Sequence, residues 1–181
     1  MKIFKQQFKI RDSIHIEIQD KYGNVKSSRT INEGFFRRIL IRLGLAHNSM
    51  TLTGFAATTA LLGNVTPPAA FTVIGIGTGT GAAGEANTKL GTPIKLKAAT
   101  VTQEDLGGHT HNVLQLVATF SAALDTISGT ASITEVGVHN GTNNDTAICL
   151  LRQVYTPADV LNWDQGDQMI VTVTIEVKQG A

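Results

Sequence analysis

The stretch FTVIGIGTGTGAAGE, residues 71–85, decides between two kinds of fold. Gly79, Gly81 and Gly84 have the spacing of a dinucleotide-binding loop and follow an apolar run that is typical of a strand. Such a loop binds a pyrophosphate only where an amphipathic helix follows it. After Gly84 the sequence shows no apolar periodicity and soon reaches Pro93, so no such helix is expected. We therefore predict a tight turn between two strands, with its backbone packed against a neighbouring chain.

The larger part of the chain, residues 69–181, which includes this stretch, alternates apolar runs with turn-rich segments. The apolar runs are AFTVIGIG, PIKLKAATV, NVLQLVATFS, ASITEVGVH, AICLLRQVY and QMIVTVTIEV. In the last run Val171 and Val173 lie on one face of an extended chain and Thr172 lies on the other. Short strands with turn signals at nearly regular spacing predict an all-β fold, an antiparallel β-sandwich of the jelly-roll or immunoglobulin-like type.

The first part of the chain, residues 1–45, has the pattern of a hairpin followed by a helix. FKI and IHIEIQD alternate as half-buried strands do, and the turn signal DKYGN, residues 20–24, leads into VKSSRTI. The apolar spacing then becomes helical, which predicts a helix over 33–43 with Asn32 as its N-cap. We expect Phe36 on this helix to contact the sandwich or a neighbouring subunit.

Residues 46–68 are rich in Thr, Ala and Gly and have no clean period, so we expect an extended arm or loop. Leu52, Phe55, Leu61 and Leu62 make this segment too apolar for a free loop. Such a segment becomes ordered when it buries apolar area on another chain. We therefore expect these residues, with Phe36, to form assembly contacts in a homo-oligomer, and a trimer is the favoured state.

Composition excludes several classes of partner. The chain has 181 residues with 15 Lys and Arg against 14 Asp and Glu, a net charge of +1. No strong positive field is available to attract nucleic acid or anionic lipid. The mildly apolar stretch 50–76 is interrupted by Pro67 and Pro68, so no membrane span is expected. The N-terminus lacks the apolar core of a signal peptide, which favours synthesis in a cytoplasm.

The sequence gives no support for nucleophilic catalysis. It contains no G-x-S-x-G motif, and Cys149 lies in the apolar run AICLL, where burial makes a thiol inert. The acidic pairs Glu104–Asp105 and Asp164–Asp167 offer an acid and a base or calcium ligands in principle. Neighbouring acids in loops are more often solvated turn residues, and the EF-hand spacing is not met.

Two oppositely charged residues, Glu135 and Arg152, fall within predicted strands. If the runs 131–138 and 147–156 form a hairpin closed by NGTNND, both side chains share one face and pair across it. This pairing predicts a structural salt bridge and no catalytic function.

The motif GGHTHN, residues 107–112, is the strongest candidate for a metal site. His109 and His111 are two residues apart, so both imidazoles point to the same side of a strand. Three chains around an axis would offer six such ligands. That arrangement resembles the iron-holding His-x-His pairs of trimeric phage fibres and spikes. The alternative is a pair of surface histidines, because two ligands from one chain fall short of a site. No other cofactor is expected.

Residues 70–178 resemble a module of tailed-bacteriophage virion proteins. The resemblance rests on the order of IGTG, ATFSAA, SITEVGV and LLRQVYTPADVLNWDQGDQMIVTVTIEV. It implies a non-enzymatic structural component of the virion, made in the host cytoplasm and placed in the tail, baseplate or fibre-attachment region. Its partners would be itself and other virion proteins, with no nucleic acid and no membrane.

Other functions stay open at this point. Within the virion, the alternative is a decoration (cement) protein on the outside of the head. A more distant alternative is a host-surface glycan-binding module, which would normally present aromatic platforms. The aromatic content is 6% and Trp163 is the single Trp, so the glycan reading is disfavoured. A metal-assisted hydrolase is less favoured again.

Overall fold

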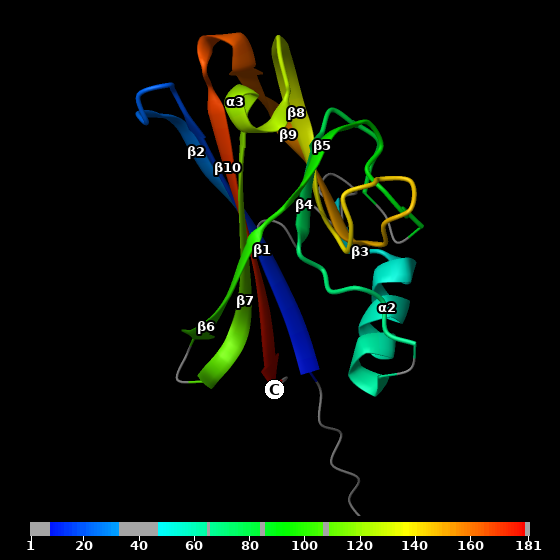
Figure 1. Ribbon diagram of the computed structural model, residues 1–181. Helices are drawn as coiled ribbons and strands as arrows, with labels where there is room; N and C mark the ends of the chain where they lie inside the picture. The colour runs from blue at the N-terminus through cyan, green and yellow to red at the C-terminus, as the bar shows by residue number, and fades with distance from the viewer. Residues whose placement is uncertain (1–7, 33–46, 65, 84–85, 107–108, 180–181) are drawn as a thin grey trace, which may run out of the picture.

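The computed structural model describes residues 8–32, 47–64, 66–83, 86–106 and 109–179. The helix expected over 33–43, with Phe36, lies outside these residues. The described residues form two five-stranded sheets in which every neighbouring pair is antiparallel (Figure 1). The predicted antiparallel all-β fold is therefore confirmed at this level.

The strands of the first sheet, in spatial order, are β2 (Val25–Asn32), β1 (Phe8–Gln19), β10 (Gln168–Gln179), β7 (His109–Ser121) and β6 (Thr100–Leu106). Those of the second sheet are β3 (His47–Met50), β9 (Cys149–Asn162), β8 (Thr130–His139), β4 (Val73–Gly77) and β5 (Pro93–Ala98). The described helices are α2 (Leu52–Gly63), α3 (Ala122–Asp125) and the 3₁₀ turn η1 (Trp163–Gln165). Every apolar run predicted after residue 69 lies in one or two of these strands.

One face of each sheet contributes to a shared hydrophobic core. In β10, Val171 and Val173 are fully buried and Thr172 is only partly buried, as the alternation predicts. The largest fully buried apolar side chains come from both sheets and from η1: Trp163, Phe120, Ile14, Ile16, Ile74, Ile76, Leu116, Ile133, Leu161 and Met169. Burial of these side chains is the main favourable term in the stability of the domain.

The predicted N-terminal hairpin is present as β1 and β2. The Asp20 carboxylate closes its turn by accepting hydrogen bonds from the backbone N–H groups of Tyr22 and Asn24, at 2.8 and 2.9 Å. The other edge of β1 pairs along its whole length with β10. The hairpin therefore forms one edge of the first sheet.

Ionic side chains join the two sheets at both sides of the core. On one side Arg29 of β2 donates to the Asp159 carboxylate of β9, and its guanidinium lies 4.9 Å from the centroid of the Tyr155 ring. On the other side Lys97 of β5 donates to the backbone carbonyl of Thr119 in β7 at 2.7 Å. These contacts fix the second sheet over the first.

The expectation of an extended arm over residues 46–68 is wrong. The segment contains β3, which pairs with β9, and the helix α2. Thr51 caps α2, since its hydroxyl accepts a hydrogen bond from the Gly54 N–H at 2.9 Å. The covered side of α2 is made of small residues, Gly54 and Ala57, so the sequence carries no strong helical apolar period. That small side lets the helix lie directly on β9 (Figure 1).

A methyl group at Gly54 tests this mounting of α2. A Cβ at this position would lie 2.5 Å from the backbone carbonyl oxygen of Leu150, which cannot move without distorting β9. We expect Gly54→Ala to lower the free energy of unfolding by about 1–3 kcal/mol, the usual effect of overpacking. Urea unfolding measures the change. Ala56→Ser, at an exposed position of the same helix, is the control and should stay within about 0.5 kcal/mol of the wild type.

Candidate functional site

The glycine-rich segment connects two antiparallel strands. β4 ends at Gly77, and β5 begins at Pro93 and pairs back onto β4. A dinucleotide-binding loop would lead instead into a helix and a parallel strand. The predicted link between two strands is therefore confirmed, but it is a long connection over 78–92 and not a tight turn. At Gly79 and Thr92 its backbone bonds to Glu135 of β8 in the same chain, and the expected contact with a neighbouring chain stays a prediction.

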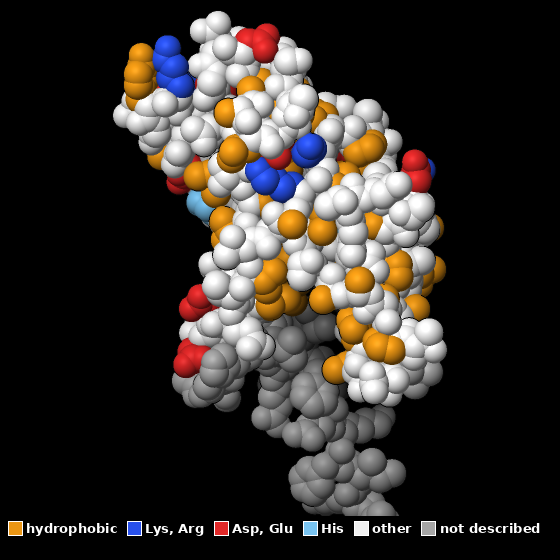
Figure 2. All heavy atoms as spheres, viewed as in Figure 1, with side chains coloured by type: hydrophobic (Ala, Val, Ile, Leu, Met, Phe, Trp, Pro, Cys, Tyr) orange, Lys and Arg blue, Asp and Glu red, His pale blue; other side chains and the backbone are white. Residues whose placement is uncertain are grey.

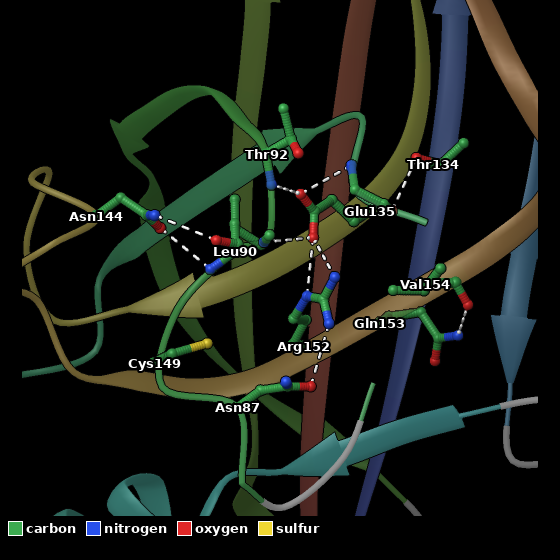
Figure 3. A network of polar contacts seen from close by, with 12 residues as sticks. Asn87, Leu90, Thr92, Thr134, Glu135, Asn144, Cys149, Arg152, Gln153 and Val154 are labelled. Carbon is green, nitrogen blue, oxygen red and sulfur yellow. Dashed lines mark hydrogen bonds and ion pairs between the residues drawn. The ribbon is translucent and has the colours of Figure 1, made fainter. Parts of the chain in front are cut away.

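The carboxylate of Glu135 in β8 holds this connection from below (Figure 3). Its Oε1 accepts hydrogen bonds from the backbone N–H groups of Gly79 and Thr92, at 3.0 and 2.8 Å. Its Oε2 accepts from the Gly91 N–H at 3.0 Å and from Nε and Nη2 of Arg152 at 2.8 and 2.7 Å. The predicted salt bridge between Glu135 and Arg152 is confirmed. The loop thus binds an internal carboxylate with the N–H groups that could otherwise hold an anion.

The Glu135 carboxylate is buried yet ionised at neutral pH. Burial by itself raises the pKa of this carboxyl group. The backbone N–H groups of Thr92 and Gly91 and the guanidinium of Arg152 outweigh that effect and bring the pKa below 4.5. A permanent negative charge therefore lies at the centre of the connection between β4 and β5.

The glycines are needed because this carboxylate leaves no room for a side chain. A Cβ at Gly77 or at Gly79 would lie 2.5 Å from Oε1 of Glu135. A Cβ at Gly91 would lie 3.0 Å from Nη2 of Arg152. By contrast, a Cβ at Gly81 would meet no heavy atom within 4 Å. The Glu135–Arg152 pair therefore requires glycine at positions 77, 79 and 91, whereas position 81 has room for a side chain.

The end of the connection, residues 86–92, forms a strap over the outer face of the second sheet. The Leu90 side chain of the strap, which we call the plug, is completely buried and packs with Val73 and Leu96. The floor beneath it consists of Gly75 and Gly137, where an added Cβ would approach Leu90 to 2.8 and 2.9 Å. Glycine at these two strand positions therefore makes the socket for the plug.

Side-chain amides hold the strap in place. The Asn144 side chain accepts a hydrogen bond from the Leu90 N–H at 3.1 Å and donates to the Leu90 carbonyl at 3.3 Å (Figure 3). Arg152 donates from Nη1 to the Asn87 amide oxygen at 3.1 Å. Sequence reasoning missed the strap. The signal available for it was the run of glycines at alternate positions, 75, 77 and 79, in an otherwise apolar strand.

Two titratable side chains, His139 and Cys149, are buried next to this cluster. Burial lowers the pKa of His139 to about 4, although the charge of Glu135 acts in the opposite direction. Within the described residues neither ring nitrogen of His139 has a hydrogen-bond partner. Burial raises the pKa of Cys149 to about 12, so its thiol is protonated at neutral pH and unreactive, as predicted.

The predicted metal pair is not resolved at the level of side chains. His109 and His111 lie at the start of β7, and their side chains are outside the part of the chain that is described. Among the described residues, no group of three or more His, Cys, Asp or Glu side chains could hold a metal ion. The metal site therefore stays a prediction.

The acidic pair near the last turn stabilises the fold. The Asp164 carboxylate accepts a hydrogen bond from the Gly129 N–H at 2.9 Å. The Asp167 carboxylate is buried, accepts from the Asn162 N–H at 2.9 Å and pairs with Lys26 at 2.8 Å. Each carboxylate therefore already serves a turn or a strand end.

The outer face of α2 exposes large apolar side chains. Leu52 is 59% and Leu62 83% exposed, and Leu61, four residues after the buried Ala57, is 39% exposed at the edge of the covered side. Hydrophobic side chains gather over α2 at the lower right of Figure 2, with no charged side chain among them. The sequence has no Asp, Glu, Lys or Arg between Arg42 and Glu85. The side chain of Phe55, expected to join this surface, lies outside the description.

The threonines of α2 reduce its polar surface further. Thr58 and Thr59 donate their hydroxyl hydrogens to backbone carbonyls of the same helix, Gly54 and Ala56, both at 2.9 Å. These hydroxyls are therefore partly satisfied without solvent.

In the described chain, no helix has both the length and the hydropathy to cross a membrane.

The comparisons with known proteins give no match. The chain matches none of the family models, curated proteins or solved structures against which it was compared. Any function must therefore be argued from the sequence and the geometry described above.

The space around the glycines predicts a large loss of stability on substitution of Gly79 and a small change on substitution of Gly81. Gly79→Ala places a Cβ against the Glu135 carboxylate, so we expect it to lower the free energy of unfolding by about 1–3 kcal/mol. Gly81→Ala meets open space and should change it by less than about 1 kcal/mol. Thermal or urea unfolding of both variants measures the difference. Equal effects at the two positions would contradict the role given to Glu135.

Removing one partner of the buried ion pair between Glu135 and Arg152 should lower the free energy of unfolding further. In Arg152→Met the Glu135 carboxylate keeps its burial and loses its counter-charge, so we expect a loss of about 3–5 kcal/mol of unfolding free energy. Lys89→Met is the matched control, because it removes the exposed ion pair with Asp145 and should cost less than about 1 kcal/mol. Denaturant unfolding of the two variants side by side provides the measurement.

Proposed function

We propose that this protein is a non-enzymatic structural component of a tailed-phage virion. In this proposal it is made in the host cytoplasm and assembles with itself and other virion proteins in the tail, baseplate or fibre-attachment region. The resemblance of residues 70–178 to virion modules supplies the class of particle. The outer face of α2 is the structural observation that carries the assembly role.

The outer face of α2 has the character of a contact surface. A helix that is apolar on every side is normally buried on every side. Here Gly54 and Ala57 are buried, while Leu52 and Leu62 are exposed. The cap of Thr51 and the small residues against β9 fix the helix, so these leucines are presented at a constant position. A partner surface for them must itself be apolar and uncharged, and a second copy of α2 meets that requirement. We propose a homotrimer built on this surface.

The charged groups inside the described fold support a structural role. Glu135, Asp159 and Asp125 each receive a cation from another strand. Trp163, which would be the natural platform for a glycan, is buried in the core. This burial weighs against the glycan-binding alternative. We also class the two sheets as a β-sandwich of the jelly-roll or immunoglobulin-like type, a proposal that their shared core supports.

The metal enters this proposal only through the assembled oligomer. One chain supplies two imidazoles, His109 and His111, which are too few for iron or zinc. Three copies would supply enough ligands if the start of β7 lies near the three-fold axis. Elemental analysis of the purified oligomer tests this part separately, because a metal-free trimer leaves the assembly proposal intact.

Substitution of one exposed leucine tests the assembly surface. We expect light scattering to give a trimer of the 19.2 kDa chain and Leu62→Lys to give a smaller species, because burying an unpaired ammonium in a contact is costly. Leu124→Lys is the matched control: Leu124 is 69% exposed in α3, away from α2 (Figure 1), and the variant should remain trimeric. A wild-type monomer at high concentration would overturn the self-association.

Location in the particle distinguishes the virion alternatives. Electron microscopy of phage particles labelled with an antibody to this protein should place the label on the tail, baseplate or fibre attachment. Label spread over the head would favour the decoration alternative. Particles that carry no label would contradict the virion role as a whole.

A further inference from the structure

The strap and the side chain of His139 lie close together on the outer face of the second sheet. Nε2 of His139 lies beside the two glycines that form the floor of the Leu90 socket. A Cβ at Gly137 would be 2.9 Å from this nitrogen, and a Cβ at Gly75 would be 3.4 Å from it. The imidazole and the Leu90 side chain are both fully buried and lie against the same two glycines.

The charged groups around His139 offer no free acceptor for the N–H groups of a protonated imidazole. On its own strand the charged neighbour is Glu135, whose carboxylate oxygens already accept from Arg152 and the strap. On β9 the ionisable groups nearest to His139 along the strand are the neutral thiol of Cys149, its partner in the ladder, and the cation Arg152, while Tyr155 and Asp159 lie further along and contact Arg29. Nearby β4 contributes Gly75 to the floor. Lys89 of the strap is paired with Asp145 at the surface.

We propose that residues 86–92 form an acid-sensitive latch, in which protonation of His139 releases the Leu90 plug and frees the strap from the sheet. An imidazolium beneath the plug would be a buried charge without an acceptor, which is strongly unfavourable. The strand that carries His139 is held between β4 and β9. The strap is held by hydrogen bonds, by the exposed ion pair of Lys89 with Asp145 and by one apolar side chain. Opening of the strap is therefore the least costly way to hydrate the ring.

The direction of the pH effect follows from linkage. The pKa of His139 is about 4 under the closed strap, and it returns toward 6.5 when the ring is hydrated. The open state thus binds more protons, so closure is strongest above pH 6.5 and weakens as the pH falls toward 4. For these two values the opening equilibrium increases about 20-fold between pH 7 and pH 5.

Hydrogen exchange of the strap amides tests the latch directly. The N–H groups of Gly91 and Thr92 bond to Glu135 in the closed state and are freed when the strap opens. After correction for intrinsic exchange, we expect their opening equilibrium to increase about 20-fold from pH 7 to pH 5. Amides in the centre of β10 report global unfolding and should not increase in parallel.

Two variants separate the latch from a general loss of stability. His139→Leu removes the titrating ring, and because the ring has no described hydrogen-bond partner the apolar replacement is tolerable; the pH step at Gly91 and Thr92 should disappear. His15→Gln changes a histidine that contacts Thr30 in the other sheet and should leave the step unchanged.

Each outcome bears on the latch independently of the virion proposal. If the strap amides show no pH step, or if they change together with those of β10, the latch is refuted. A step that persists in His139→Leu refutes the role of His139. Should that variant not fold, the wild-type comparison between strap and β10 amides still decides whether the strap opens locally.

Discussion

The rest of the second sheet depends on one buried carboxylate. Glu135 bonds at once to the backbone of the connection after β4, to the strap before β5 and to the guanidinium of Arg152 on β9. A single charge thereby links three neighbouring strands and the long connection between two of them. Because an ionised group in the interior must be surrounded by donors, the chain around it is restricted to conformations that point N–H groups inward. The glycines follow from that restriction.

The outer face of this sheet is consequently organised like a small second core. Glycines at 75 and 137 leave a depression, Leu90 fills it, and Asn144 fixes the backbone of the plug from the neighbouring loop. The imidazole of His139 lies beside the same two glycines. The same absence of side chains that lets the strap lie flat also removes the atoms that could have bonded to the imidazole. Close packing and sensitivity to protonation thus have a common origin.

The helix α2 shows the opposite use of small residues. Gly54 and Ala57 bring the helix axis close to β9, so the larger side chains are directed outward. In an ordinary surface helix the apolar side faces inward. This distribution, together with the lack of charge between Arg42 and Glu85, makes the surface of α2 seen in Figure 2 apolar and uncharged.

The sequence by itself determined the strands of 8–32 and those after residue 69, the hairpin turn and the pairing of Glu135 with Arg152, because each depends on alternation or on spacing within one hairpin. It also excluded a dinucleotide loop, since no helix could follow Gly84. Only the tertiary structure decided what the glycines contact, where Leu90 lies and that residues 52–63 are helical. Those features depend on side chains far apart in the chain, such as Glu135 and Gly79, and on a helix whose buried side is nearly featureless in sequence. Local pattern cannot report contacts of that range.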